Sequence, residues 1–442
     1  MLPRLVVAVS IYLHLGTLQE YLVEQHTVSY LISSLAYATH STSPRLHQLF
    51  TMTVSESRLW QPLKVGNSLL SQRIAMAPLT RYRNDDNHAP LDMMIKYYSD
   101  RASAPGTLII SEATGVSQAA EADPNLPGVS TEEEIAGWKR VYEGVHAKGS
   151  FMFQQLWDLG RAGNPQYVQS RGFKYASSSA KQMEGRPVPP EALTEEEIYQ
   201  KIADFRNAAK NVVAAGGDGV EIHGAHGYLV DQFTRDSINS RTDRWGGSVE
   251  NRARFLLEII KAVVEEIGAE RTALRLSPFA TFQGSFSTDT WEQTGYIIRE
   301  LKKAGYNLAY LSLVEPRGNP VNLGIVPAQP MDAVKPFGDK AQELEFILEE
   351  WDNQSPVFVA GAYMPDTAAE ALDGRYKNWD VAIAFGRYFI SNPDLVFRAK
   401  NGVPFTPYDR ETFYVKKSSV GYNDYPFSEE YLAATSEPTA RI

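Results

Sequence analysis

Eight short apolar runs alternate along the chain with longer stretches of helical period, from Ile74 onward. Such alternation is typical of repeated strand–helix units built around a parallel sheet. Each run is almost continuously apolar, as a strand that is buried on both faces should be. The runs are Ile74–Ala77, Thr107–Ile110, Phe151–Gln155, Gly219–His223, Thr272–Leu276, Leu308–Leu313, Val357–Ala360 and Val381–Phe385.

Eight units favour a closed barrel over an open doubly wound sheet, and no run is followed by the G-x-G-x-x-G turn of dinucleotide-binding folds. The predicted fold is therefore of the α/β class, a (β/α)8 TIM barrel. The segment Leu63–Ile74, with Gly66-Asn67 at its centre, predicts an N-terminal hairpin that plugs the bottom of the barrel. Thr194 and Glu197 form a capping box ahead of an amphipathic helix, and Gly163–Leu193 reads as a long irregular loop.

The composition of the chain excludes some partners and some kinds of reactive site. The chain has 442 residues, a net charge of −10 and no cysteine. The acidic balance and the scattered basic residues disfavour nucleic acid and membrane surfaces as partners. The lack of cysteine excludes disulfides, thiol nucleophiles and cysteine-ligated metals, so other side chains or a cofactor must carry the reaction.

The first residues differ from the rest. Leu5–Gly16 is apolar and Ala36-Tyr37-Ala38 resembles a signal cleavage site, but the two lie too far apart for a secretory signal. We expect residues 1–51 to be a poorly ordered extension, Met52 to begin the natural protein, and residues 52–442 to form one barrel domain. A cytoplasmic location follows from this interpretation.

Polar residues follow the predicted strands at the end where barrels of this kind hold their active sites. Glycines after the last two strands would let backbone N–H groups approach a phosphate, and an arginine there would add charge and two parallel donors. The residues are Thr80, Gln155, His223, His226, Arg275, Gly361, Gly386 and Arg387.

The segment His223-Gly224-Ala225-His226-Gly227-Tyr228 places two imidazoles and a phenol within six residues. Two imidazoles can donate to one carbonyl oxygen and stabilise developing negative charge, while a phenol beside them can deliver a proton. Carbonyl-conjugated chemistry is one interpretation. A metal site is another, although no third ligand is evident, and histidines that only satisfy a turn are the third.

Several strings of residues carry a family resemblance, each at its expected strand. They are Ala77-Pro78-Leu79-Thr80-Arg81, Gln154-Gln155-Leu156-Trp157, Gly219 to Leu229, Asn239 to Ser248, Arg275-Leu276-Ser277-Pro278 and Phe385-Gly386-Arg387. From Leu59 to about Tyr425 the chain resembles the old yellow enzyme family of FMN-dependent ene-reductases, particularly its fungal members.

The resemblance implies a role for each matching residue. Pro78, Leu79, Thr80 and Ala113 would lie along the flavin, with alanine at 113 where many relatives have glycine. Gln155 and Arg275 would bind its pyrimidine edge, and Gly361, Gly386 and Arg387 its phosphate. His223 and His226 would bind the substrate carbonyl, and Tyr228 would protonate the adjacent carbon. Trp157, Phe282, Phe413 and Tyr414 would line the substrate pocket, whereas Arg241 to Asn251 reads as a structural brace.

The predicted function is NADPH-dependent reduction, through FMN, of the activated C=C bond of a small enone or enal, in fungal secondary metabolism or detoxification. The protein would act as a monomer or a homodimer and hold no metal. Two alternatives remain at this point: a flavin-free (β/α)8 lyase, since this fold supports many chemistries, and a redox-neutral, isomerase-like pathway enzyme.

Overall fold

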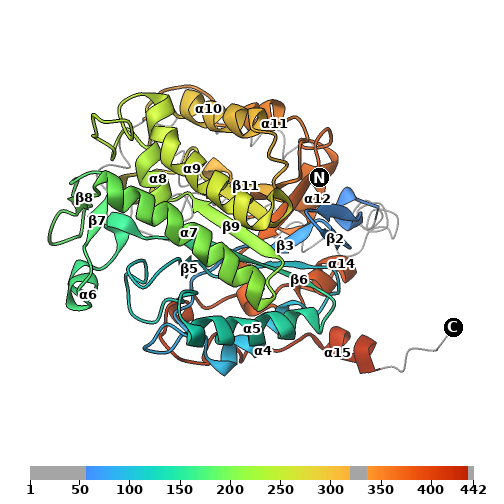
Figure 1. Ribbon diagram of the computed structural model, residues 1–442. Coiled ribbons are helices and arrows are strands. Elements are labelled where there is room, and N and C mark those ends of the chain that lie inside the picture. The colour runs from blue at the N-terminus through green and yellow to red at the C-terminus, as the bar shows by residue number, and fades with distance from the viewer. Residues whose placement is uncertain (1–55, 319–335, 437–442) are drawn as a thin grey trace, which may run out of the picture. The chain divides into compact units, whose positions relative to one another are not determined.

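The computed structural model describes residues 56–318 and 336–436, all of which fall in one compact unit that covers Val54–Ile442. The predicted extension, residues 1–51, lies outside the described residues. Figure 1 shows this unit as a central sheet with helices packed around it.

Eight parallel strands close into a barrel, so the predicted fold is confirmed. Each strand pairs with the next along the chain, and the last pairs with the first, Ile383 opposite Ile74. The strands are β3 (Ile74–Met76), β4 (Leu108–Ile110), β6 (Phe151–Trp157), β9 (Gly219–Gly224), β10 (Thr272–Leu276), β11 (Tyr310–Val314), β12 (Val357–Ala360) and β13 (Val381–Phe385).

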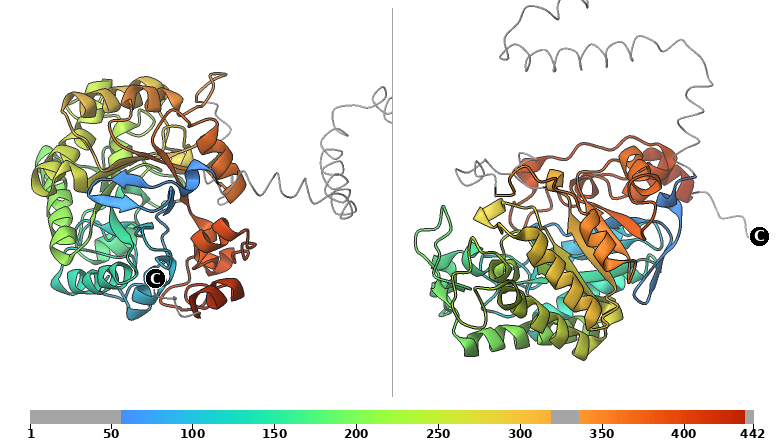
Figure 2. Two further views of the ribbon diagram at one scale, coloured as in Figure 1. Left: turned by 90° about the vertical axis from the view of Figure 1, so that its right-hand side faces the viewer. Right: turned by 90° about the horizontal axis from the view of Figure 1, so that it is seen from above.

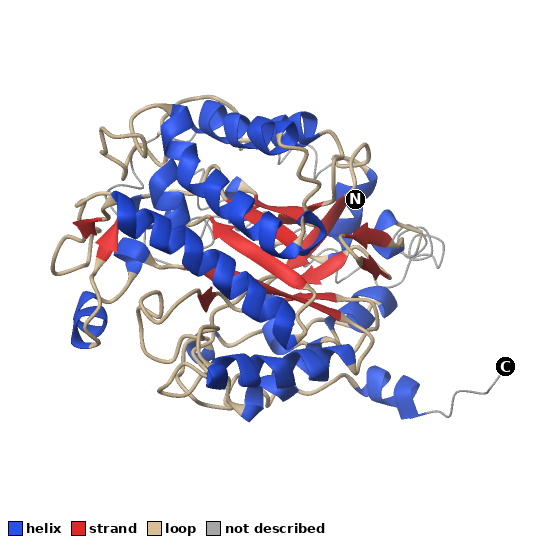
Figure 3. Ribbon diagram, in the orientation of Figure 1, coloured by secondary structure: helices blue, strands red, loops and turns tan. Residues whose placement is uncertain are grey.

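Helices cover the outside of the barrel (Figure 3). The longest, α7, begins at the predicted capping box, because the Thr194 side chain accepts from the Glu197 N–H and the Glu197 carboxylate accepts from the Thr194 N–H. The described helices are α4 (Asp92–Arg101), α5 (Glu132–His146), α6 (Pro165–Ser170), α7 (Glu195–Ala215), α8 (Leu229–Thr234), α9 (Val249–Ile267), α10 (Thr290–Lys303), α11 (Glu345–Trp351), α12 (Pro365–Asp373), α13 (Arg387–Ser391), α14 (Leu395–Asn401) and α15 (Glu429–Ser436).

The predicted hairpin is present as β1 (Leu63–Val65) and β2 (Ser68–Leu70), which pair antiparallel. Three of its side chains, Leu63, Val65 and Leu70, are buried in the same cluster as the side chains of the barrel interior. The turn lies close against the barrel: a Cβ on Gly66, where φ is +50°, would stand 2.0 Å from the Glu270 carbonyl oxygen just before β10. The hairpin therefore closes the N-terminal end of the barrel (Figure 2, left).

The structure corrects three local predictions. The sixth strand begins at Tyr310 rather than at Leu308, because the Ala309 N–H bonds to Ala269 and Thr272 ahead of the ladder. The third strand runs on to Trp157, where β5 (Thr114–Gly115) pairs with it. The stretch 163–193 is not wholly irregular, since it contains α6 and the short parallel pair β7 (Ala176–Ser177) and β8 (Glu191–Ala192).

Candidate active site

A cavity of about 190 Å³ opens at the C-terminal ends of the strands. Six of the predicted cofactor residues line it together with one of the two histidines, so residues from β3, β9, β10, β12 and β13 meet at one place. They are Pro78, Leu79, Arg275, Gly361, Gly386, Arg387 and His226. Its lining includes both Arg275 and Arg387, so two cationic side chains border the same cavity.

Arg275 supplies a buried cation that has unused donors. Its side chain is 6% exposed, and neither Nε nor Nη1 has a hydrogen-bond partner among the described residues. Glu221, one strand away on β9, lies 3.9 Å from Nη1, which is too long for a hydrogen bond. Unpaired buried donors are costly and are expected to bond to a ligand, so this guanidinium fits the acceptor edge of a flavin ring.

Gln155 is held beside Arg275 by the same carboxylate. Its Nε2 donates to Glu221 Oε1 at 2.6 Å, which fixes the amide group. Burial raises the pKa of Glu221, although Arg275 and Gln155 oppose the shift. Glu221 was not predicted from the sequence, and it lies against both Gln155 and Arg275.

Close contact with Glu315 explains why glycine stands at 361. A Cβ there would lie 2.3 Å from Glu315 Oε2, so a larger residue would displace that buried carboxylate. Gly386 directly precedes α13, whose first residue is Arg387. The Arg387 guanidinium is positioned by a hydrogen bond from Nη1 to the Tyr408 hydroxyl at 2.7 Å. Among residues 56–318 and 336–436, its other donors form no hydrogen bond, so they could bind an anion.

Four aromatic rings gather beside this cavity. Trp157 stacks on His223 with ring centroids 6.0 Å apart, and Tyr228 packs edge-on against both, at 4.6 Å from Trp157 and 5.0 Å from His223. The His226 ring lies 5.7 Å from that of His223. The structure therefore brings together the two imidazoles and the phenol that the spacing of the motif suggested.

Both histidines are held neutral. Burial and the nearby Arg275 cation lower the pKa of His226 to about 3. Burial, His226 and Arg275 lower the pKa of His223 well below its usual value. The Ala225 N–H donates to His223 Nδ1 at 3.3 Å, which leaves the ring proton on Nε2. Each imidazole can therefore donate one hydrogen bond without carrying charge.

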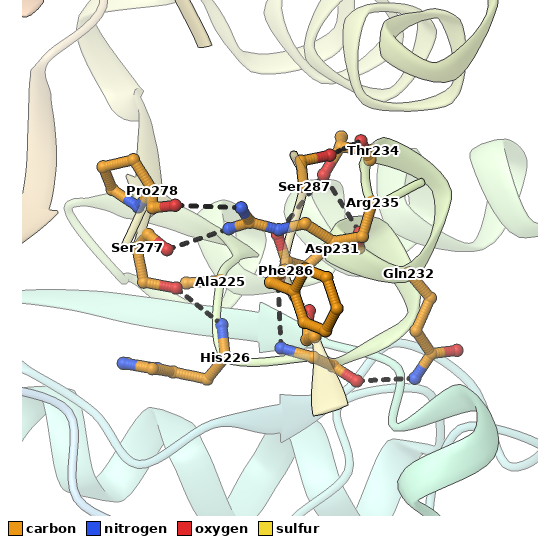
Figure 4. A network of polar contacts seen from close by, with 12 residues as sticks. Ala225, His226, Asp231, Gln232, Thr234, Arg235, Ser277, Pro278, Phe286 and Ser287 are labelled. Carbon is orange, nitrogen blue, oxygen red and sulfur yellow. Dashed lines mark hydrogen bonds and ion pairs between the residues drawn. The ribbon is translucent and has the colours of Figure 1, made fainter. Parts of the chain in front are cut away.

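The loop that carries His226 and Tyr228 is held in place by the ion pair between Asp231 and Arg235. Asp231 accepts from the Gly227 N–H and pairs with Arg235, whose Nη2 donates to the Ser277 carbonyl. The Ser277 hydroxyl in turn accepts from the His226 N–H at 2.9 Å. Figure 4 shows this network, which fixes His226 at a φ of +59° against the end of β10. None of these supporting residues was predicted.

The other predicted site residues differ in how deeply they are buried. Ala113 is buried with Trp157, and Thr80 is half-buried after β3. The Phe282 carbonyl lies against the loop, 3.2 Å from a Cβ placed on Gly227. Tyr414 is 56% exposed and packs its ring on Tyr82, so it stands at the mouth of the site rather than inside it.

Phe413 is the residue before Tyr414, and its place in the substrate pocket stays a prediction. It is 7% exposed, and its carbonyl accepts from Arg81 Nε at 3.0 Å and from Arg83 Nη1 at 2.8 Å. It anchors the segment that presents Tyr414.

The Arg241–Asn251 string is a brace, as predicted. Arg241 Nη1 donates to the carbonyls of Ser178 and Leu193, and Ser248 caps α9 through the Asn251 N–H. These contacts tie the 163–193 stretch to the barrel rather than lining the cavity.

Within residues 56–318 and 336–436, no group of three or more histidine, cysteine or acidic residues is arranged so that it could hold a metal ion. In the same residues, no helix is long and apolar enough to cross a membrane.

Comparison with known proteins decides between the enzyme classes. Residues 58–405 match the model of the NADH:flavin oxidoreductase / NADH oxidase family. The chain belongs to this family. It is a flavin oxidoreductase that binds FMN, as the resemblance to old yellow enzymes implied, and the flavin-free lyase is excluded.

Individual relatives are named as a reductase and an oxidoreductase, which agrees with this family. The family member chanoclavine-I aldehyde reductase fgaOx3 of Penicillium roqueforti is 50% identical over 86% of this chain and 98% of its own. The NADP-dependent oxidoreductase lnbE of Aspergillus flavus is 48% identical over 85% of this chain and 97% of its own. Among solved structures, Old Yellow Enzyme from Pichia sp. AKU4542 matches with a TM-score of 0.75 and 37% identity, covering 87% of this chain and 95% of that one.

Proposed function

We propose that this flavin oxidoreductase uses NADPH to reduce the activated C=C bond of α,β-unsaturated carbonyl compounds, in fungal secondary metabolism or detoxification and in the cytoplasm. The observation that carries the proposal is the pair of neutral imidazoles packed against a protonated phenol beside the cofactor cavity. Two relatives, named an aldehyde reductase and an NADP-dependent oxidoreductase, support a carbonyl substrate and NADPH.

The histidines bind the carbonyl oxygen. His223 offers its Nε2–H because Nδ1 is occupied by the Ala225 N–H, and His226 offers a second donor from the ring next to it. Two fixed donors stabilise the negative charge that grows on this oxygen when hydride arrives at the β-carbon. Their neutrality matters, because a charged imidazolium is a much stronger acid and would give its own proton to the enolate oxygen instead of only donating a hydrogen bond.

Tyr228 delivers that proton. Burial raises the pKa of its phenol, so the hydroxyl stays protonated at neutral pH and is available as an acid. The ring is held by Trp157 and His223, while Asp231 fixes the backbone one residue earlier through the Gly227 N–H. A positioned acid of this kind typically accelerates proton transfer ~10²–10⁴-fold.

The cofactor is held by residues at both ends of the 190 Å³ cavity. When FMN is bound, Arg275 and Gln155 would hold its pyrimidine edge, Pro78, Leu79, Thr80 and Ala113 its ring, and Gly361, Gly386 and Arg387 its phosphate. Hydride transfer is the chemistry that FMN supplies there when bound. Trp157, Phe282 and Tyr414 shape the space above, and residues 52–442 are sufficient for the whole site.

The test is single-turnover stopped-flow. The FMN-loaded protein is reduced anaerobically with NADPH and mixed with a panel of cyclic enones, enals and nitroalkenes, and the return of flavin absorbance is followed. We expect rapid reoxidation by at least one enone or enal, with a product two mass units heavier than the substrate. Reoxidation by none of them, or conversion to a product of unchanged mass, would contradict the proposal and favour a redox-neutral role.

A further inference from the structure

A second cavity, of about 400 Å³, lies apart from the cofactor cavity and shares no lining residue with it. It is formed by the segment 181–186, by Arg161, and by residues 237, 283 and 284. Its lining holds three cationic side chains, Arg161, Lys181 and Arg186, against one carboxylate, Glu184. In a chain whose net charge is −10, this local excess of positive charge is a departure from the rest of the surface.

The arginine at the back of this cavity is buried and incompletely paired. Arg161 is 3% exposed, its Nη2 donates to the Gln283 carbonyl at 2.7 Å, and its Nε has no partner among the described residues. Burial lowers its pKa to about 10, so it still carries its charge at neutral pH. A buried cation that faces a cavity without a counter-ion is a strong indication of an anionic ligand.

The other two cations are also without acidic partners. Within residues 56–318 and 336–436, no carboxylate lies within 4.0 Å of the charged nitrogens of Arg161, Lys181 or Arg186. Arg186 donates through Nη2 to the Ala162 carbonyl, while its buried Nε is unpaired. The three charges are therefore not consumed by ion pairs within the described part of the chain.

This cavity adjoins the candidate active site. Gln283 lines it, and its Cβ would lie 3.2 Å from a Cβ placed on Gly227, the residue directly before Tyr228. Met183, also in its lining, packs on the cluster that contains Trp157 and Tyr228. A molecule whose reactive ring lies beside Tyr228 could therefore place an anionic tail among the three cations.

We propose that the cavity lined by Arg161, Lys181 and Arg186 binds a phosphate of the nicotinamide dinucleotide that reduces the enzyme. The inference rests on the proposed NADPH dependence and deepens it. A phosphate offers several acceptor oxygens for the fork of an arginine and the point charge of a lysine. The phosphate could be the pyrophosphate, shared by NADH and NADPH, or the 2′-phosphate that only NADPH carries.

The experiment measures dinucleotide binding apart from substrate reduction. Flavin reduction in the full-length, FMN-loaded protein is followed anaerobically over a range of NADPH and, separately, NADH concentrations, which gives a Kd and a limiting rate. The variant is Lys181→Glu, since this side chain is exposed and the bond from Arg161 is accepted by the Lys181 backbone carbonyl, which the substitution keeps. Lys139→Glu, on the exposed face of α5, is the control with the same change in net charge.

We expect Lys181→Glu to raise the Kd for the dinucleotide on the order of five- to tenfold, with the limiting rate unchanged. The effect should shrink as salt is added, because exposed charges are screened. Lys181→Arg should restore binding, and Lys139→Glu should bind as the natural protein does. Arg186→Gln should weaken binding similarly.

The comparison of NADH with NADPH shows which phosphate the cavity binds. A loss confined to NADPH assigns the 2′-phosphate, and an equal loss for NADH and NADPH assigns the pyrophosphate. An unchanged Kd for both in Lys181→Glu and Arg186→Gln would overturn the proposal. Failure of enone reduction would not affect this result, because flavin reduction is observed before any enone is added.

Discussion

The two ends of the barrel are built on opposite principles. At the bottom, the β1–β2 hairpin fills the opening with Leu63, Val65 and Leu70, which pack on the interior side chains. At the top, the strands end in Arg275, Gln155 and their neighbours, which are equally buried but polar. Burial at the bottom therefore stabilises the fold, whereas the buried polar groups at the top can bond to a ligand.

Burial therefore changes the free energy of folding in opposite directions at the two ends of the barrel. Burying a leucine or valine side chain stabilises the fold by ~1.5–3 kcal/mol. A buried polar atom without a partner instead costs about 1–3 kcal/mol. The top of the barrel contains several such atoms, including Arg275 Nε and Nη1, Trp157 Nε1 and Glu221 Oε2. Ligand binding at the top should therefore stabilise the protein, whereas the bottom needs no ligand.

The largest expected effect is on stability, at the bottom. Leu70→Ala removes a fully buried side chain from the plug and should lower the free energy of unfolding by ~2–5 kcal/mol. Chemical denaturation at fixed free FMN measures this change. Enone turnover per bound flavin should stay the same, and Leu69→Ala, at an exposed position next to it, should alter neither quantity. A large loss of turnover in Leu70→Ala would break the separation of the two ends.

The next effect is on chemistry, at the top. His223→Ala removes one of the two donors to the carbonyl oxygen and should slow flavin reoxidation by an enone ~10²–10³-fold, or about 2.7–4 kcal/mol of barrier. Single-turnover kinetics measures the rate. His146→Ala, on the outer helix α5, is the matched control and should leave it unchanged. If both variants behaved alike, His223 would have no role at the substrate.

Cofactor retention should respond somewhat less. Arg387→Ala removes a charge-assisted contact at the phosphate end and should weaken FMN binding by about 1.5–3 kcal/mol, roughly 10- to 100-fold. Equilibrium dialysis of the flavin gives the Kd. Arg140→Ala, which removes a surface ion pair to Asp92, serves as the control. Undiminished FMN affinity in Arg387→Ala would show that the phosphate lies elsewhere.

The smallest expected effect concerns pH, because the rate of enone reduction should not respond to it in the range where histidines usually titrate. Because burial and Arg275 lower the pKa of both histidines, neither should gain a proton as the pH falls from 8 through 6.5 to 5.5. Enone reoxidation should then show no inflection near pH 6.5, the ordinary histidine value. In His223→Ala the profile should remain flat. An inflection near 6.5 that disappears in His226→Asn would mean that His226 is not held neutral.

The sequence predicted the barrel and its plug well, because both follow from repeated apolar runs and one Gly-Asn turn. It also predicted residues that the fold brings to one cavity, such as Arg275 and Gly386, since the ends of parallel strands meet at one edge. Their roles came from the family resemblance.

The supporting contacts could not be predicted. Glu221 looks like one polar interruption in an apolar strand, and only closure of the barrel places it between Gln155 and Arg275. Asp231 and Arg235 read as an ordinary i,i+4 pair on a helix, yet they are buried and reach Ser277 more than forty positions away. Such long-range partners depend on packing that no local pattern encodes.

The assignment of Tyr228 as the proton donor is tested most directly by comparing two oxidants in Tyr228→Phe. Flavin reduction by NADPH should be nearly unchanged, because that step needs no proton from the phenol. Reoxidation by a cyclic enone should slow ~10²–10⁴-fold. Reoxidation by a nitroalkene should fall much less, because the nitronate formed by hydride addition can leave and take its proton from water. Unchanged reoxidation by the enone, or an equal loss with both oxidants, would contradict the assignment.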